Sequence, residues 1–156
     1  MKRVFYGFKY LFNHHILYIG LVASGGTYLS DIFYLNTFSV REYIRALSRG
    51  NTAIALSLDL TERMQMAGWL YWRIYETQFR KSDFAERFGF DFDRIYGSQM
   101  TFLARLGMLN DDGERIVLTD RGNYWLHAFE DLFSIDYISE LWGTSKQNPW
   151  PETVVL

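Results

Sequence analysis

Residues 103–122 read LARLGMLNDDGERIVLTDRG and contain the signals that decide the fold. Gly107 follows a stripe of apolar residues at helical spacing, so a helix is expected to end there. The turn residues Asn110–Gly113 then separate two short extended runs, which predicts a β-hairpin. Thr119 precedes another apolar helical pattern, so its hydroxyl is expected to cap a final helix. The stretch therefore predicts a helix, a two-stranded wing and a closing helix.

Two capping boxes upstream predict two further helices. Ser39–Glu42 opens a helix whose apolar side chains recur at helical spacing until Gly50 ends it. Asp59–Glu62 opens a longer helix, with an apolar stripe that reaches Ile74. Residues 50–57 lie between these helices and are interpreted as a linker.

A short helix and a longer one follow. Ser82 is expected to cap the short helix, which Gly89 ends. Asp93 is expected to cap the next helix, which runs to Gly107. After the wing and the closing helix, a further helical piece is expected over residues 135–142. Helix, short helix, helix, wing and closing helix is the order of a winged-helix domain. The expected fold is therefore α+β and mainly α, a winged-helix-like domain with a short β-hairpin.

The N-terminal part has a different pattern. Residues 16–23 (ILYIGLVA) are apolar and β-branched, and Gly25-Gly26 follows them, which predicts a buried strand and a tight turn. Residues 27–38 are expected to be irregular or extended. The expected organisation is a strand and turn segment over residues 1–38, a helix and linker over 39–57, and the winged-helix-like domain over 58–156.

Composition excludes several classes of site. The 156 residues contain no cysteine, so they provide no disulfide, no thiolate zinc site and no cysteine-ligated iron–sulfur cluster. The formal net charge of −2 argues against a nucleic-acid binder, which usually carries a basic excess on one face. Asn13, His14 and His15 interrupt the N-terminal apolar run, so neither a signal peptide nor a membrane span is expected. We therefore predict a cytoplasmic protein with no membrane partner.

Aromatic residues are abundant, with 13 Phe, 11 Tyr and 5 Trp. Most of these rings are expected to form the core, and the alternative is that some line a flat ligand site or a partner's interface. His14, His15 and His127 are the candidates for binding heme iron, but the favoured interpretation makes them surface or capping residues. No serine elbow, phosphate loop or pair of spaced carboxylates is present, so no catalytic residue and no metal ligand is predicted.

Several motifs occur in an order that resembles a known family. They are Ile19-Gly20, Ser24, Thr27-Tyr28, Phe33, Asn36, the Val40–Ile44 helix, Gly50, Phe88-Gly89, Leu103–Leu109 and Leu118–Gly122. In order and spacing, residues 13–156 resemble the C-terminal part of oxygen-independent coproporphyrinogen III oxidase and related radical S-adenosylmethionine (SAM) proteins. These relatives include heme chaperones and heme-utilisation enzymes. The resemblance implies that residues 1–38 correspond to the edge of a barrel and that the winged-helix-like domain follows it.

The chain departs from this family in two ways. The family's radical chemistry needs a CxxxCxxC loop, whose thiolates hold a [4Fe–4S] cluster that cleaves SAM, and this chain contains no such loop. Val22 stands where the family has the second glycine of a Gly-x-Gly step, and its two methyls would crowd a ligand close to the backbone. The resemblance therefore implies a stand-alone or truncated C-terminal region with no cofactor and no radical SAM activity of its own.

The resemblance also implies a set of site residues. The small residues after the first strand would let the chain turn beside the SAM and porphyrin cleft. The implied cofactor-binding residues are Gly20, Ala23, Ser24, Tyr28 and Asn36. Porphyrin propionates are carboxylates, which the arginine fork matches. Arg41 and Arg45 lie one helical turn apart and close in sequence to Asn36, so they are the candidate substrate-binding residues.

Three functions stay open at this point. The first is a non-catalytic C-terminal domain of a coproporphyrinogen III oxidase-like protein, which assists tetrapyrrole binding or packs on a partner barrel chain or on itself. The alternative is a small winged-helix protein that binds nucleic acid or a protein partner. The third is a remnant whose exposed apolar face makes it dimerise or aggregate.

Overall fold

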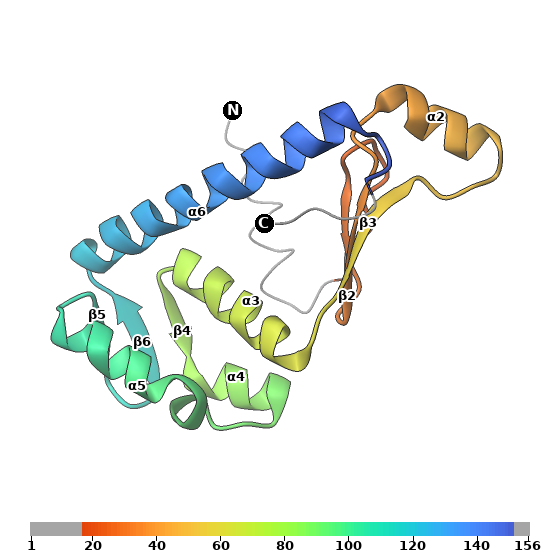
Figure 1. Ribbon diagram of the computed structural model, residues 1–156. Coiled ribbons are helices and arrows are strands. Elements are labelled where there is room, and N and C mark those ends of the chain that lie inside the picture. Colours follow the sequence, from red (N-terminus) through yellow and green to blue (C-terminus); the bar gives the residue numbers. More distant parts are fainter. Residues whose placement is uncertain (1–16, 152–156) are drawn as a thin grey trace, which may run out of the picture. The chain divides into compact units, whose positions relative to one another are not determined.

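The computed structural model describes residues 17–151, and within its last helix the side chains of residues 130–138, 141, 142 and 146 are not described. The chain divides into two compact units (Figure 1). Unit 1 comprises residues 1–65 and 135–156, and unit 2 comprises residues 66–134. Among the described residues, no helix is long and apolar enough to cross a membrane.

Unit 1 is built on a three-stranded antiparallel sheet. Its strands are β1 (Gly26–Tyr28), β2 (Ile32–Asn36) and β3 (Ile54–Asp59), in the order β1-β2-β3. Residues 27–38, which were expected to be irregular or extended, include most of the hairpin of β1 and β2, so the extended alternative is correct for its strands. The linker predicted over residues 50–57 is wrong, because β3 begins inside it. Apolar residues alternate with small or polar ones along β3, and this period of two was the signal for a strand.

The buried strand predicted over residues 16–23 is also wrong for its described part. Only Tyr18 pairs with the sheet, through a single antiparallel bridge to Tyr28. Leu21 is 78% exposed and Val22 is 65% exposed. The backbone leaves the sheet here because the Gly20 amide donates to the Thr27 hydroxyl (2.9 Å), which turns the chain into a compact loop.

Helix α2 (Val40–Ser48) begins and ends at the predicted residues. The Ser39 hydroxyl accepts a hydrogen bond from the Glu42 amide, and Gly50 follows the helix with a φ of 74°. Glu42 does not complete the capping box, because its carboxylate pairs with Arg45 instead (2.7 Å). The apolar stripe of Val40, Ile44 and Leu47 faces solvent, with exposed fractions between 51% and 63%.

Unit 2 combines helices with a second small sheet. Its elements are α3 (Glu62–Tyr75), which begins in unit 1, β4 (Gln78–Arg80), α4 (Lys81–Phe88), α5 (Phe92–Arg105), β5 (Leu109–Asp111), β6 (Arg115–Leu118) and the first half of α6 (Asp120–Gln147). The predicted hairpin is confirmed as β5 and β6, which pair antiparallel. Strand β4 was not predicted, and it makes the sheet three-stranded in the order β4-β6-β5.

Three predicted helix starts need correction. Asp59 is the last residue of β3, and the hydroxyl of Thr61 accepts from the Met64 amide at the start of α3 instead. Helix α4 directly follows strand β4, so Ser82 already lies inside its first turn and caps nothing. Asp91, and not Asp93, caps α5 by accepting from the Arg94 amide (2.9 Å). The helix ends at Gly89 and Gly107 are confirmed, since both glycines have a left-handed φ.

Helix α6 is a single element of 28 residues, so the prediction of two separate helical pieces is wrong. Its predicted cap is confirmed, because the Thr119 hydroxyl accepts from the Gly122 amide (3.0 Å). No proline interrupts the segment, and nothing in the sequence forces the break that was expected before residue 135. Residues 148–151 follow the helix, and the rest of the predicted extended tail lies outside the described residues.

The described hydrophobic core lies in unit 2. Its buried members are Met66, Trp69, Phe79, Phe84, Phe92, Met100, Leu109, Ile116 and Leu118. Trp69 packs edge-on against Phe79 and Phe84, with ring centroids 5.4 and 5.3 Å apart. These buried rings come from α3, β4, α4 and α5, but the expectation that most aromatic residues form the core is not met among the described residues, many of whose rings are exposed or half-buried.

An ion pair network joins three elements of unit 2. The Lys81 ammonium lies 2.8 Å from both the Asp93 and the Asp111 carboxylates, and the lysine side chain is only 12% exposed. Burial alone lowers the pKa of Lys81. The hydrogen bonds to Asp111 and Asp93 and the charges of these carboxylates raise the pKa, and together they outweigh burial, so the net shift is upward. Because the folded pKa is raised, this contribution to stability is present below pH about 10 and is lost as pH rises through the folded value.

We expect Lys81→Met to lower the free energy of unfolding at neutral pH by about 1–2 kcal/mol, because two carboxylates lose a charged hydrogen-bond donor. The measurement is urea unfolding at pH 7 and again at strongly alkaline pH. The difference between wild type and variant should shrink at the alkaline pH. Arg87→Met on α4 is a control away from this network. An equal difference at both pH values would contradict the prediction.

Candidate functional site

The loop formed by residues 19–26, here called the glycine loop, is folded tightly on its own backbone. A Cβ placed on Gly20 would lie 2.6 Å from the Gly25 carbonyl carbon and 2.7 Å from the Gly26 carbonyl oxygen. A Cβ on Gly25 would lie 2.8 Å from the Val22 carbonyl oxygen. Both contacts are closer than any side-chain carbon tolerates, so these glycines are needed by the loop itself.

Asn36 holds this loop in place. Its side-chain amide donates to the carbonyl oxygens of Gly20 (2.9 Å) and Val22 (3.0 Å), and its backbone amide donates to Gly25 (3.0 Å). The side chain is almost fully buried, with 6% of the residue exposed. Asn36 therefore makes three hydrogen bonds to this loop, two from its side-chain amide and one from its backbone amide, and it acts as a structural clamp.

Two buried threonines extend the clamp, and neither role was predicted from the sequence. Thr27 and Thr37 are fully buried. Thr37 accepts from the Ser24 amide through its carbonyl (2.9 Å), and its hydroxyl donates to the Pro149 carbonyl (2.7 Å). This last bond ties the sheet to the end of the chain's described part. No local pattern in the sequence signals a contact between residues so far apart.

The five implied cofactor-binding residues lie together, but they have different environments. Gly20 and Asn36 form the clamp, Ala23 is half-buried, and Ser24 is exposed with a left-handed φ of 61°. Tyr28 is half-buried, and its ring stacks on Tyr18 with centroids 6.0 Å apart. Burial, and then the neighbouring Tyr28, raise the pKa of Tyr18. Of the five residues, only Asn36 is buried, and the others keep atoms exposed to solvent.

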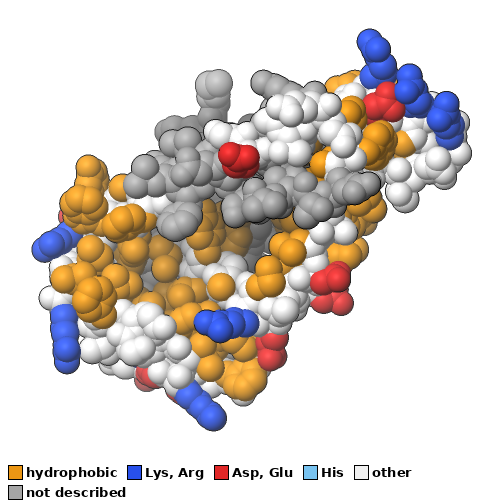
Figure 2. All heavy atoms as spheres, in the orientation of Figure 1, with side chains coloured by type: hydrophobic (Ala, Val, Ile, Leu, Met, Phe, Trp, Pro, Cys, Tyr) orange, Lys and Arg blue, Asp and Glu red, His pale blue; other side chains and the backbone are white. Residues whose placement is uncertain are grey.

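The two candidate arginines lie on α2, beside the glycine loop. The Tyr43 hydroxyl donates to the Leu21 carbonyl, which connects the helix to the loop. Arg41 and Arg45 are both exposed, and Figure 2 shows Lys and Arg side chains gathered over this helix. Arg45 pairs with Glu42 (2.7 Å) while half of its side chain stays exposed. The exposed apolar residues Leu21 and Val22 lie on the same loop.

The family's iron–sulfur cluster does not fit the residues of this chain. The 156 residues include no cysteine, so no thiolate ligand is available. Among the side chains that the structure describes, no group of three His, Asp or Glu residues is arranged to hold a metal ion. His127 packs edge-on against Tyr75, with ring centroids 5.0 Å apart. His14 and His15 lie outside the described residues.

We expect Asn36→Ala to open the glycine loop and to cost about 2 kcal/mol locally, because two carbonyls lose their donor. Amide hydrogen exchange at Gly25 and Ser24 is the measurement, and both amides should exchange at least tenfold faster. Asn51→Ala is the matched control, since Asn51 is exposed after α2. Unchanged exchange in the Asn36 variant would show that the clamp does not hold the loop.

Comparisons with known proteins agree with this fold. A family model described as the HemN C-terminal domain matches residues 77–125, while no curated protein matches the chain. A solved structure of coproporphyrinogen III oxidase (HemN) from Escherichia coli, a radical SAM enzyme, is similar over 74% of this chain, with a TM-score of 0.60 and 16% identity. The similar part spans 27% of that enzyme's chain. These findings confirm the resemblance in its main point: this chain contains a HemN C-terminal-like region.

Proposed function

We propose that this chain serves as the non-catalytic C-terminal part of a coproporphyrinogen III oxidase-like radical SAM assembly and helps to hold a tetrapyrrole there. The observation that carries the proposal is the match of residues 77–125 to the HemN C-terminal domain, which coincides with the folded core of unit 2. The cluster and SAM would come from a barrel that lies outside these 156 residues, because they include no cysteine. In such an assembly the chain would bind and orient, and the barrel would perform the chemistry.

The surface of α2 and the glycine loop supports tetrapyrrole binding. A tetrapyrrole is a flat apolar ring system edged by carboxylates. Leu21 and Val22 offer exposed apolar contact, and Arg41 and Arg45 offer two guanidinium groups one helical turn apart. Guanidinium groups bind carboxylates in a two-pronged geometry. The macrocycle would lie against the loop, with two of its carboxylates on the arginines.

A spectral titration tests this proposal. Hemin and coproporphyrin are each added to the purified chain, while the Soret band and the aromatic fluorescence are followed. A saturable one-to-one shift is expected with both, because the proposed contacts involve the ring and its carboxylates. The double variant Arg41→Gln, Arg45→Gln should weaken binding at least tenfold. Arg94→Gln on α5 is the control, because this arginine is also exposed. No saturable shift, or equal binding by both variants, would refute the proposed site.

A second candidate function is favoured by the topology of unit 2. The order α3-β4-α4-α5-β5-β6, with the sheet order β4-β6-β5, is the arrangement expected for a winged helix. We propose that this winged helix contacts a protein rather than nucleic acid. Helix α5 occupies the recognition position, and its exposed basic residues are Arg94 and Arg105. The carboxylates of Asp91 and Asp93 at its start would repel a phosphate backbone.

A binding isotherm with a fluorescent DNA duplex distinguishes a winged helix that contacts a protein from one that binds nucleic acid. The protein-binding version predicts weak binding with little dependence on salt. A slope of several units in the plot of log affinity against log salt would favour nucleic acid instead.

A further inference from the structure

Unit 2 exposes a group of large apolar side chains, here called the aromatic surface. It consists of Phe102 on α5, Leu106 directly after that helix, and Tyr124, Trp125 and Phe129 on α6. Tyr124 is 69% exposed, Phe102 is 61%, Phe129 is 51% and Trp125 is 45%. Large contiguous apolar patches are rare on the surface of a soluble monomer and usually mark a contact with a partner.

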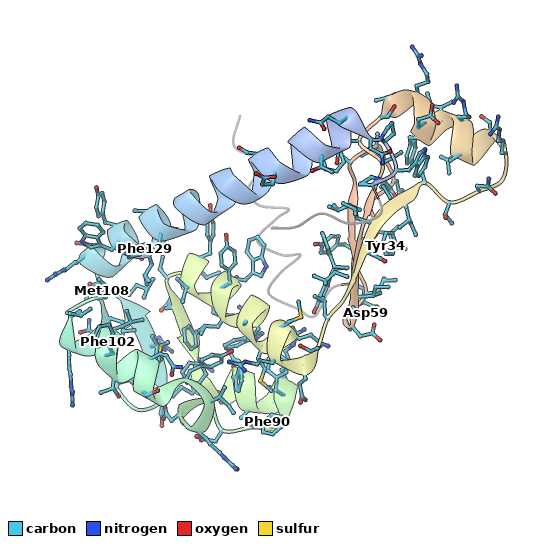
Figure 3. All side chains as sticks on the ribbon, viewed as in Figure 1. Tyr34, Asp59, Phe90, Phe102, Met108 and Phe129 are labelled. Atoms are coloured by element: carbon cyan, nitrogen blue, oxygen red, sulfur yellow. The ribbon has the colours of Figure 1, made fainter. Side chains whose placement is uncertain are left out.

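The start of α6 lies beside the end of α5, which brings the two groups of side chains near each other. The Thr119 hydroxyl donates to the Gly107 carbonyl (2.8 Å), and the Thr119 amide donates to the Met108 carbonyl (3.0 Å). These bonds place the first turns of α6 next to Leu106. Figure 3 shows Phe102, Met108 and Phe129 along the same edge of unit 2. Trp125 contacts both Tyr124 and Phe129, with centroids 5.4 and 6.4 Å away.

The size of the aromatic surface matches what a symmetric dimer needs. Large aromatic side chains bury roughly 150–250 Å² each, so the exposed fractions leave on the order of 500 Å² of apolar area. A standard interface buries about 800 Å² on each partner, of which about 60% is apolar, or nearly the same area. Trp, Tyr and Phe are also the residues that dominate interface energies.

Charge favours a second copy of this chain as the partner. The formal net charge is only −2, so two copies repel each other weakly. The aromatic surface itself is bordered by Arg105, Arg121 and Asp120, which carry both signs and can pair across a twofold axis. The apolar stripe of α2 lies beside Arg41, Arg45 and Arg49, so two copies of that stripe would bring like charges together.

From these observations we infer that the aromatic surface is a symmetric interface, through which two copies of this chain form a homodimer. In this dimer Phe102, Tyr124, Trp125 and Phe129 pack against the same residues of the second copy. The inference goes beyond the proposed function and does not depend on tetrapyrrole binding, because none of these residues belongs to α2 or the glycine loop.

Sedimentation velocity of the full chain over a range of concentrations is the first test. Wild type should have twice the chain mass of 18.5 kDa. Phe102→Asp and Phe129→Asp, made separately on two helices, should each restore the monomer mass. Ile44→Asp on α2 is the matched control, since Ile44 is 58% exposed, and it should remain dimeric. Circular dichroism establishes that each variant is folded.

Two outcomes of this test would overturn the inference. One is a wild-type chain that stays monomeric at the highest concentration. The other is a dimer that Ile44→Asp dissociates and the two aromatic-surface variants leave intact, which would place the interface on α2.

A crosslink provides an independent measurement, because the chain has no cysteine of its own. A single Tyr124→Cys substitution treated with a bis-maleimide should give a covalent dimer, which additional Phe102→Asp suppresses. Ile44→Cys, treated in the same way, should stay monomeric on a denaturing gel. Equal crosslinking at positions 44 and 124 would mean random collision and would refute the interface.

Discussion

Phe84→Ala is expected to lower the free energy of unfolding of unit 2 by about 3–5 kcal/mol. Phe84 on α4 has no exposed surface, and four rings surround it. The centroids of Phe88, Trp69, Phe92 and Tyr96 lie between 4.9 and 5.8 Å from its own. Alanine would remove the ring and leave a cavity among side chains that come from three helices. These rings cannot all move inward, so the cavity would persist and its cost would be near the upper end for this type of substitution.

Urea unfolding followed by tryptophan fluorescence measures this loss, since Trp69 contacts Phe84 directly. Phe90→Ala is the matched control, because Phe90 follows α4 and is 37% exposed. Removing that ring should cost less than about 1 kcal/mol. If the two variants lost similar stability, the described packing of Phe84 would be wrong.

The helices of unit 2 could be predicted because their ends depend on local chemistry. Gly89 and Gly107 stop α4 and α5 through a left-handed backbone that other residues adopt only at a cost, and Thr119 caps α6 with its own hydroxyl. Such signals are contained within a few consecutive residues. The hairpin of β5 and β6 belongs to the same class, because its turn ends in Gly113 with a φ of 94°.

Strands β3 and β4 were missed, and each pairs with a strand distant in sequence; only β3 carries a local signal, its alternation of apolar with small or polar residues. Arg80 in β4 pairs with Arg115 in β6, and Phe33 in β2 pairs with Leu58 in β3. A three-residue strand such as β4 is too short to show a period. Once β3 extends to Asp59, that residue can no longer cap a helix, which moves the start of α3 to Thr61.

The sequence also indicated only part of the candidate site. The five residues that the resemblance implies lie together in one loop and hairpin. The sequence did not reveal that Gly20 and Asn36 are occupied with each other, because their contact spans 16 positions in the chain. The space beside Gly20 and Gly25 is occupied by the backbone of the glycine loop itself. In this loop Leu21 and Val22 are exposed to solvent.

Gly122→Ala is expected to cost about 3 kcal/mol or more, although alanine normally favours a helix. Gly122 lies in the first turn of α6, inside the segment Leu118–Gly122 that carried part of the family resemblance. A Cβ at this position would lie 1.7 Å from the Met108 carbonyl oxygen, which is backbone and cannot rotate away. The start of α6 would have to move, and the two bonds that Thr119 donates to Gly107 and Met108 would break.

Gly68→Ala, in the same unit, is expected to have the opposite effect on stability. Gly68 lies inside α3, and a methyl group added there would have no neighbouring atom within 4 Å. Alanine should therefore stabilise the protein by about 0.5–1 kcal/mol through its higher helix propensity. Urea unfolding of both variants should give changes of opposite sign for one chemical substitution. A small or favourable effect at Gly122 would mean that α6 does not start against Met108. In that case the two groups of side chains in the aromatic surface would no longer be held near each other, because the same contacts join α5 to α6.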